Sequence, residues 1–214
     1  MFMNLVSWPT LVFLCFMVGL AGFVDASAGG GGLISLPDYM VTGLPVHLLY
    51  GANKFSSACG TTFASAMFFR SGALDLQVAL IAAAASFAGS TLGSRLVLLL
   101  PGEVLKIMVL VMLPIAALII FTQRKLPEED RSSQVPRKKA LTLAVVIGLL
   151  IGLYDGLVGP GTGTFAIIAF TSVLKFDLRT ASGNAKVLNL ASNYASLITY
   201  IGAGNVPFAL AIPC

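Results

Sequence analysis

Hydrophobic residues in this chain form long uninterrupted runs and seldom alternate with polar ones. The longest runs cover residues 11–24, 63–69, 78–100, 104–121, 140–154 and 187–201. A helix needs roughly 20 mostly apolar residues to cross the hydrocarbon of a bilayer. Several runs reach that length together with the small residues that flank them. The pattern therefore predicts an all-α fold, a polytopic transmembrane helical bundle.

Two shorter apolar runs, residues 33–41 and 165–174, each follow a glycine-rich break. At 1.5 Å per residue they are about 14–15 Å long as helices, which is half the hydrocarbon thickness. Glycine and proline interrupt helices, because one costs backbone entropy and the other lacks an N–H group. Irregular backbone at membrane depth needs protein or a water-filled cavity to satisfy its polar groups. We therefore expect two half-helices beside a polar cavity.

The two breaks belong to a repeated pattern of an acid, a glycine break and a lysine. The first copy is Gly22-Phe23-Val24-Asp25, Gly29-Gly30-Gly31-Gly32 and Asn53-Lys54, and the second is Gly152-Leu153-Tyr154-Asp155, Gly159-Pro160-Gly161-Thr162-Gly163 and Asn184-Ala185-Lys186. Duplicated, interrupted hydrophobic segments that carry charges are typical of transporter binding sites. We divide the chain into a first transmembrane repeat (1–121), a charged linker (122–139) and a second repeat (140–214). The second repeat lacks counterparts of the last two spans of the first, so we expect a C-terminally truncated chain or a short variant.

Composition and charge agree with a membrane location. Hydrophobic residues make up 57% of the chain and charged residues 10%, whereas soluble domains carry about 25% charged residues. The linker holds +3 of the net charge of +4, so the basic balance does not indicate a nucleic-acid partner. Basic loops face the cytoplasm, which places the linker and loops 70–75 and 175–179 inside and the uncharged loops 42–51 and 202–206 outside. The halves then have opposite orientations, and we predict an inverted repeat with its N-terminus outside.

Neither a metal site nor a cofactor site is indicated. The three cysteines (Cys15, Cys59 and Cys214) and the single His47 have no metal-ligand spacing, and an odd cysteine count gives no disulfide framework. The sequence Ala26-Ser27-Ala28 resembles a signal-peptide cleavage site. However, no basic residue precedes the apolar run as a signal peptide requires, so we expect a retained membrane helix.

Four charged residues lie inside the repeated motifs. A charge within an apolar helix costs several kcal/mol unless it is paired or hydrated. We expect Lys54 and Lys186 to open helices and to attract an anion into the cavity. Asp25 and Asp155 are then proton-coupling groups or structural partners of the lysines. In the alternative interpretation, buried Asp–Lys pairs only lock the two repeats together, and the two interpretations are compatible.

The glycines offer a second means of binding an anion. A half-helix that begins just after Gly32 or Gly163 directs free N–H groups and a positive dipole end into the cavity. We therefore expect an electropositive cavity. The candidate substrate-binding residues are Gly29, Gly30, Gly31, Gly32, Asn53, Lys54, Gly159, Gly161, Gly163, Asn184 and Lys186. Alternatively the glycines serve only close helix packing, which we also expect of the small-residue patterns at 89–93 and 148–152. A nucleotide site is excluded, since the G-x-x-x-x-G-K-[ST] order is missing.

At these motifs the chain resembles the TauE/SafE family of bacterial membrane transporters, the sulfite-exporter type. The segments that carry the resemblance are residues 22–37, Asn53-Lys54, residues 155–163 and Asn184-Ala185-Lys186. In the second copy one residue separates the asparagine from the lysine, unlike in the first. The resemblance spans nearly the whole chain. It implies transport of sulfur-containing or related organic anions across the bacterial inner membrane by a multi-pass protein.

The sequence thus favours a secondary transporter, not an enzyme, for sulfite, sulfonates or related small anions. Its partners are the small anion and the lipid bilayer, and its oligomeric state is left open. Two alternatives remain. A passive anion channel would show flux that follows voltage and ignores a proton gradient. An intramembrane aspartyl protease would need Asp25 and Asp155 near hydrogen-bonding distance of each other.

Overall fold

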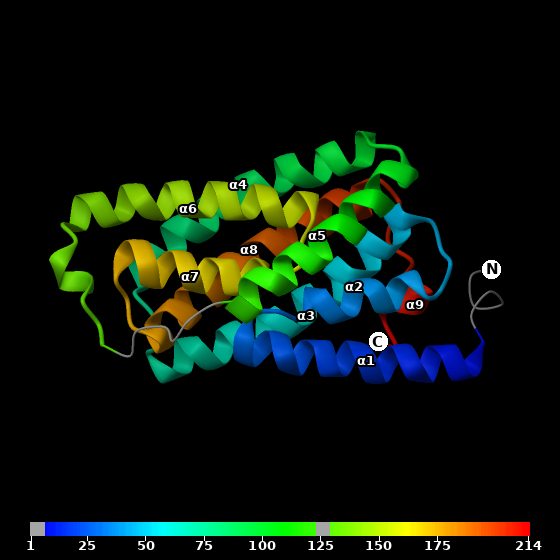
Figure 1. Ribbon diagram of the computed structural model, residues 1–214, viewed down its shortest axis with the longest axis horizontal. Helices are drawn as coiled ribbons and strands as arrows, with labels where there is room; N and C mark the ends of the chain where they lie inside the picture. The colour runs from blue at the N-terminus through cyan, green and yellow to red at the C-terminus, as the bar shows by residue number, and fades with distance from the viewer. Residues whose placement is uncertain (1–6, 123–128) are drawn as a thin grey trace.

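The computed structural model describes residues 7–122 and 129–214, and all regular structure in these two ranges is helical (Figure 1). The helices are α1 (Trp8–Ala28), α2 (Gly32–Met40), α3 (Val46–Ser71), α4 (Leu76–Leu99), α5 (Gly102–Thr122), the 3₁₀ turn η2 (Ser132–Gln134), α6 (Arg137–Leu157), α7 (Thr162–Leu174), α8 (Leu178–Gly202) and α9 (Phe208–Ala211). Within these ranges, α1, α4, α5 and α6 are long and apolar enough to cross a membrane. The prediction of an all-α transmembrane bundle is confirmed.

Both predicted helix breaks are present. Gly29 ends α1 with a left-handed backbone (φ 77°), and Gly161 precedes α7 with a similar one (φ 81°). Glycine adopts this conformation at little steric cost. The short helices that follow, α2 with 9 residues and α7 with 13, are the expected half-helices. In Figure 1, α1 runs from one end of the bundle to its middle, and α7 starts there and runs to the other end.

Helices α4 and α6 approach so closely that side chains would not fit between them. A Cβ added to Gly152 of α6 would lie 2.3 Å from the carbonyl oxygen of Ser86, and one on Gly156 2.3 Å from that of Ser90. On α4, Gly89 and Gly93 pack equally closely against the α6 backbone. Contacts below 3 Å leave no room for any larger residue. The packing interpretation of both small-residue patterns is therefore confirmed.

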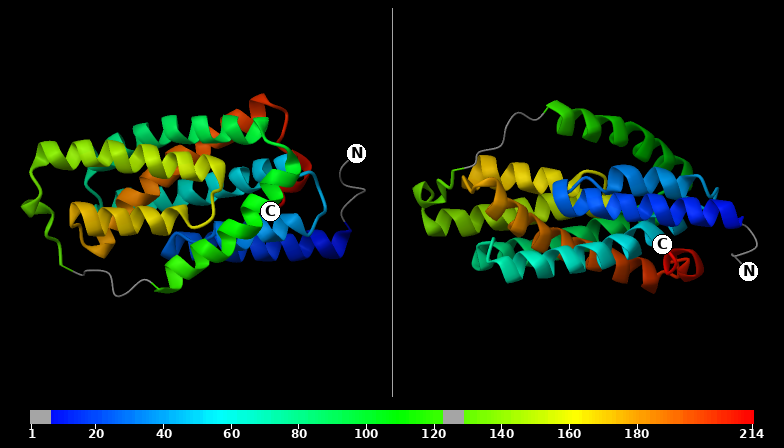
Figure 2. Two further views of the ribbon diagram at one scale, coloured as in Figure 1. Left: turned by 45° about the horizontal axis from the view of Figure 1, so that its top comes forward. Right: turned by 90° about the horizontal axis from the view of Figure 1, so that it is seen from below.

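Helix α4 also contacts α8. It therefore lies in the groove between α6 and α8. The Ser90 hydroxyl donates to the carbonyl oxygen of Ser192 at 2.7 Å, and the Ser94 hydroxyl donates to Ser196 at 2.7 Å. Helix α5 lies across the outer side of α2 and α3 (Figure 2), where its buried Leu105 and Val109 join a cluster with Leu36.

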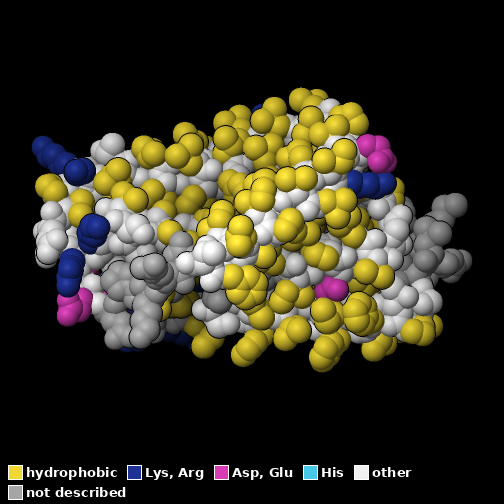
Figure 3. All heavy atoms as spheres, in the orientation of Figure 1, with side chains coloured by type: hydrophobic (Ala, Val, Ile, Leu, Met, Phe, Trp, Pro, Cys, Tyr) yellow, Lys and Arg dark blue, Asp and Glu magenta, His cyan; other side chains and the backbone are white. Residues whose placement is uncertain are grey.

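The face of the molecule seen in Figure 3 is mostly hydrophobic along its length, whereas Lys and Arg side chains gather at the end where α6 begins. Large apolar residues such as Phe16, Ile107 and Leu150 are at least 60% exposed. A soluble protein rarely exposes apolar surface on this scale. The surface therefore fits a lipid environment.

The expected start of two helices was wrong. Lys54 and Lys186 do not open helices, because α3 already begins at Val46 and α8 at Leu178. Asp177 caps α8 by accepting from the backbone N–H groups that follow it, and a capped helix start satisfies groups that would otherwise be unpaired. Each lysine therefore lies in the third turn of its helix, deep inside the bundle.

The repeat boundaries and opposite orientations remain predictions. Residues 123–128 of the expected linker lie outside the described ranges, and the linker's last residues already belong to α6.

Candidate functional site

A small polar cavity lies in the middle of the bundle, where the broken ends of α1, α2, α6 and α7 meet α3 and α8. Its lining consists of Asp25, Gly29, Gly32, Asn53, Lys54, Ser57, Asp155, Gly159, Gly161, Thr162, Gly163, Asn189 and Asn193. The two breaks touch here: a Cβ on Gly29 would lie 2.6 Å from the carbonyl carbon of Gly163, and the Thr164 N–H donates to the Gly29 carbonyl at 3.3 Å. Any larger residue at Gly29 or Gly163 would separate the two halves.

The four motif charges form two ion pairs, and each pair joins one copy of the motif to the other. The Nζ of Lys54 in α3 lies 2.6 Å from Oδ2 of Asp155 in α6. The Nζ of Lys186 in α8 lies 2.9 Å from Oδ2 of Asp25 in α1. Each lysine therefore finds its carboxylate in the opposite half, and we call this arrangement the crossed pairs. This arrangement corresponds to the alternative interpretation of the sequence, in which buried Asp–Lys pairs lock the two repeats together.

The Lys54–Asp155 pair is deeply buried and has further partners. Both side chains are at most 3% exposed. The Lys54 ammonium also donates to Oδ1 of Asn193 at 3.2 Å, and the Thr162 hydroxyl donates to Oδ1 of Asp155 at 2.9 Å. Buried charges persist where such hydrogen bonds offset the loss of water. The polar partners therefore hold the Lys54 charge in the centre of the bundle.

The Lys186–Asp25 pair is less enclosed. The Lys186 side chain is 2% exposed, but that of Asp25 is 21% exposed. The Lys186 ammonium also donates to the Asp25 main-chain carbonyl at the end of α1. Carbonyl groups at a helix C-terminus carry partial negative charge, so a lysine there is favourable. Asp25 is the most accessible of the four crossed-pair side chains.

Four lining residues were missed by the sequence argument: Ser57, Thr162, Asn189 and Asn193. In α8, Asn189 and Asn193 follow Lys186 by three and seven residues, and this spacing places them on the lysine's face of the helix. The amide of Asn193 donates to Oδ1 of Asn189 at 3.4 Å. Helical periodicity from the lysine would have identified both asparagines. Thr162 lies within the second glycine motif itself.

Most of the predicted site residues meet in one place. The cavity lining includes nine of them: Asp25, Gly29, Gly32, Asn53, Lys54, Asp155, Gly159, Gly161 and Gly163. Lys186 reaches the same region through its bond to Asp25. Asn53 accepts a hydrogen bond from Ser35 at 2.6 Å, which fixes its orientation.

Besides Lys186, three predicted residues do not line this cavity. Gly31 packs closely on α1, where an added Cβ would lie 2.5 Å from the carbonyl oxygen of Ala21, and Gly30 lies beside it. The oxygen of the Asn184 side chain accepts from the backbone N–H of Asp75 at 2.9 Å. Asn184 therefore holds the loop before α4. Substrate binding by these three residues remains a prediction.

The positive and negative charges in the site balance. The sequence had instead predicted an electropositive cavity. Two lysines face two aspartates, and each lysine is within 3 Å of a carboxylate. The cavity is also small, with a volume of about 20 Å³ available to water. Holding one water takes about 10–15 Å³. In this conformation the site is closed to anything as large as an oxyanion.

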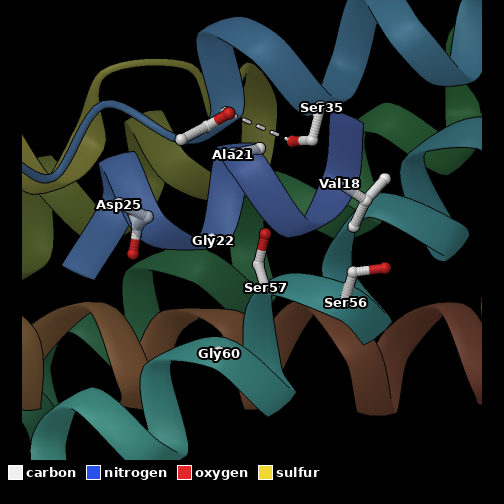
Figure 4. Close-up of a pocket in the computed structure, with 10 residues that line it drawn as sticks. Val18, Ala21, Gly22, Asp25, Ser35, Ser56, Ser57 and Gly60 are labelled. Atoms are coloured by element: carbon white, nitrogen blue, oxygen red, sulfur yellow. Dashed lines mark hydrogen bonds between the residues drawn. The ribbon is translucent and has the colours of Figure 1, made fainter. Parts of the chain in front are cut away.

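A second small cavity adjoins the first on the far side of Asp25. It lies between α1, α2 and α3 and is lined by Val18, Ala21, Gly22, Asp25, Gly31, Gly32, Ser35, Ser56, Ser57 and Gly60 (Figure 4). Figure 4 shows Gly22 of α1 and Gly60 of α3 lying across this space, with Ser57 beside them.

The two aspartates do not form a catalytic dyad in this conformation. Each carboxylate bonds to a lysine, and within residues 7–122 and 129–214 no hydrogen bond joins Asp25 to Asp155. An aspartyl protease needs two carboxyl groups that share a proton. The geometry therefore gives no support to the protease alternative.

Comparison with known families agrees with the motifs. The family model for the sulfite exporter TauE/SafE matches residues 14–214. The chain belongs to the TauE/SafE family. Two relatives support this membership. A probable membrane transporter protein of Haemophilus influenzae is 36% identical over 198 residues, which cover 92% of this chain and 76% of the relative. The probable membrane transporter protein YfcA of Escherichia coli K12 is 34% identical over 202 residues, which cover 94% of this chain and 74% of the relative.

A TauE/SafE relative from a Sinorhizobium species, named probable membrane transporter protein ORF9, is 35% identical over 197 residues. The match covers 92% of this chain and 74% of that protein. No solved structure matches the chain. As a TauE/SafE member the chain is a membrane transporter, and the crossed pairs lie at the centre of its fold.

Proposed function

We propose that the chain is a secondary carrier that moves sulfite, a sulfonate or a related small anion across the bacterial inner membrane. The crossed pairs carry this proposal. They place two lysines and a set of hydrogen-bond donors where two interrupted hairpins meet, halfway along the bundle. Sites of this kind, built from broken helices near the membrane midplane, are typical of alternating-access carriers.

The lysines are the groups that attract the anion, and the aspartates are the groups that release them. An anion added to a charge-balanced site would leave an uncompensated charge in a low-dielectric interior, which is costly. Protonation of Asp155 restores the balance and frees Lys54 for the anion. Asp25 and Lys186 can act in the same way from the other side. The carrier would therefore take up one proton with each monovalent anion.

The hydrogen-bond donors around the lysines supply the remaining recognition. Asn193 and Asn53 present side-chain amides, and Thr162 presents a hydroxyl at the start of α7. The N-termini of α2 and α7 add positive dipole ends that favour an anion. The cavity is too small for an anion in this conformation. Binding therefore requires the α1–α2 hairpin and the α6–α7 hairpin to separate on one side. The Gly29–Gly163 contact is where that movement begins.

The test is uptake of labelled sulfite or sulfoacetate into proteoliposomes that contain the purified chain. We expect uptake driven by an inward proton gradient, and loss of uptake in Lys54→Ala combined with Lys186→Ala. Lys106→Ala, which alters an exposed lysine paired only with Glu103, should leave uptake unchanged. Full uptake by the double variant would overturn the role of the lysines. Uptake that follows voltage and ignores the proton gradient would instead identify a passive channel.

A further inference from the structure

Around Gly19, Gly22 and Gly60, helices α1 and α3 share a face that is open in the described part of the structure. A Cβ added to Gly19 or Gly22 of α1, or to Gly60 of α3, would meet no atom within 4 Å. Gly22 and Gly60 line the cavity of Figure 4. We call the surface around Gly19, Gly22 and Gly60 the α1/α3 groove. Its open glycines contrast with those of α4 and α6, which are packed against backbone.

The corresponding groove in the other half is filled. Gly152 stands three residues before Asp155 as Gly22 stands three before Asp25, and Ser192 follows Lys186 by six residues as Gly60 follows Lys54. Gly152 and Ser192 both contact α4, the first through the backbone of Ser86 and the second through the hydroxyl of Ser90. Helix α4 thus lies in the α6/α8 groove at the positions that remain open in the α1/α3 groove.

Two further contacts show how a helix would enter the open groove. A Cβ on Gly183 would strike the carbonyl of Ala73, and α4 begins three residues after Ala73. In the same way a Cβ on Gly51 would strike the carbonyl of Asn205, and α9 begins three residues after Asn205. Gly51 precedes Lys54 by three residues, as Gly183 precedes Lys186. Helix α9 therefore stands where α4 has its first turn.

Helix α9 and the residues that follow it already touch both walls of the groove. The ring of Phe208 packs edge-on against Phe55 of α3 with centroids 5.9 Å apart, and Cys214 lies with its Sγ 3.2 Å from the Sγ of Cys15 in α1. These contacts place residues 208–214 at one end of the groove.

Asp25 supplies an independent reason for the groove to be covered. Its side chain is 21% exposed, whereas Asp155, beside the filled groove, is 3% exposed. Asp25 lines the cavity that opens between Gly22 and Gly60. A carboxylate open to the lipid core is costly. A helix in the α1/α3 groove would enclose Asp25 as Asp155 is enclosed.

We propose that the α1/α3 groove seats an apolar transmembrane helix with alanine, glycine or serine at about four-residue spacing on its packing face. The helix enters at α9 and packs on Gly22 and Gly60 as α4 packs on Gly152 and Ser192. Small residues on both sides are needed, because the open glycines permit a backbone approach as close as that between α4 and α6. The proposal does not depend on which substrate is transported.

The test uses the purified chain in nanodiscs with a synthetic peptide of the α4 sequence, Leu76–Leu99, as the probe. Cys59 is exposed and adjacent to Gly60, so it can carry a benzophenone photo-crosslinker in a Cys15→Ser, Cys214→Ser background. We expect a one-to-one crosslink to the α4 peptide. A peptide of the α5 sequence, Gly102–Thr122, is more apolar than the α4 peptide but has mostly large side chains, and it should crosslink poorly.

Filling the groove should prevent binding. In Gly22→Leu combined with Gly60→Leu we expect crosslinking to the α4 peptide to fall about tenfold or more, because the two leucines would fill the space that the peptide needs. The matched control is Gly202→Leu, since that glycine also has free space around it. Unfolding temperatures of both variants, which we expect to match the parent, show that they fold. Equal crosslinking in the filled variant would overturn the proposal. So would crosslinks to lipid alone or to a second copy of the chain.

Discussion

At the scale of single residues, the crossed pairs combine stability and function in the same four side chains. A buried ion pair gains little net stability over apolar residues, but removal of one partner leaves an unpaired charge in the interior. Lys54 and Asp155 are the most buried such pair in the described part of the chain. Their retention at the centre of a membrane bundle agrees with a role in binding and release.

Lys54→Ala should destabilise the folded protein more than Lys54→Met combined with Asp155→Leu. The single variant leaves the Asp155 carboxylate unpaired and should cost about 3–5 kcal/mol, whereas the double variant removes both charges together. Denaturant unfolding in detergent micelles measures the difference. Lys106→Ala should cost less than about 1 kcal/mol, because that exposed pair is screened by water. Equal losses from the single and double variants would show that Asp155 does not depend on Lys54.

At the scale of helices, stability depends on backbone contacts between α4 and α6. Because Gly152 and Gly156 lie against the main chain of α4, even a methyl group must push the helices apart. We expect Gly152→Ala to cost about 1–3 kcal/mol, the range for overpacking. Gly22→Ala is the matched control at the corresponding position of α1, which has free space, and it should be nearly neutral. Thermal unfolding of both variants checks the contrast; a neutral Gly152→Ala would contradict it.

The start of α4 should lose stability in acid. Hydrogen bonds from Arg137 lower the pKa of Asp75, whose carboxylate also caps α4 by accepting from the Val78 N–H at 3.1 Å. A lowered folded-state pKa stabilises the protein above the unfolded pKa of about 3.9, and the gain disappears as the pH falls through the lower folded value.

Asp75→Asn tests this dependence. The stability difference between the parent and this variant should be constant above about pH 5 and should shrink below about pH 4. Unfolding midpoints at several pH values provide the measurement. Asp130→Asn, in an exposed part of the linker, serves as a control that should not change the profile. A difference that stays constant down to pH 2 would contradict a lowered pKa of Asp75.

At the scale of the whole molecule, the two ends of the bundle should face different compartments. The N-terminal end of α1 and the loop after α8 lie at one end, and the start of α6 at the other (Figure 1). The positive-inside rule places the start of α6 in the cytoplasm. In a cysteine-free background, Ser7→Cys and Ala203→Cys should react with an impermeant maleimide on intact cells. Ser133→Cys should react only after permeabilisation, and the reverse pattern would refute the orientation.

The sequence was informative where the chemistry is local. Glycine and proline between apolar runs identified both helix breaks, and the length of the following runs identified α2 and α7. It was uninformative where partners are distant. The separation between Asp25 and Lys54 is similar to that between Asp155 and Lys186. Spacing along the chain therefore does not show which carboxylate each lysine contacts. The balance of charge in the cavity followed from that pairing and was missed. Asn189 and Asn193 were missed because the motif ended at Lys186.

The crossed pairs also impose an order on biogenesis. Translation delivers Asp25 and Lys54 to the membrane about one hundred residues before the ribosome reaches Asp155 and Lys186. During that interval the newly inserted half contains a carboxylate and an ammonium whose eventual counter-ions have not been synthesised. Leaving them bare in lipid is costly, so the nascent half must keep them hydrated or let them meet each other. Completion of the protein then exchanges those temporary arrangements for the final ones.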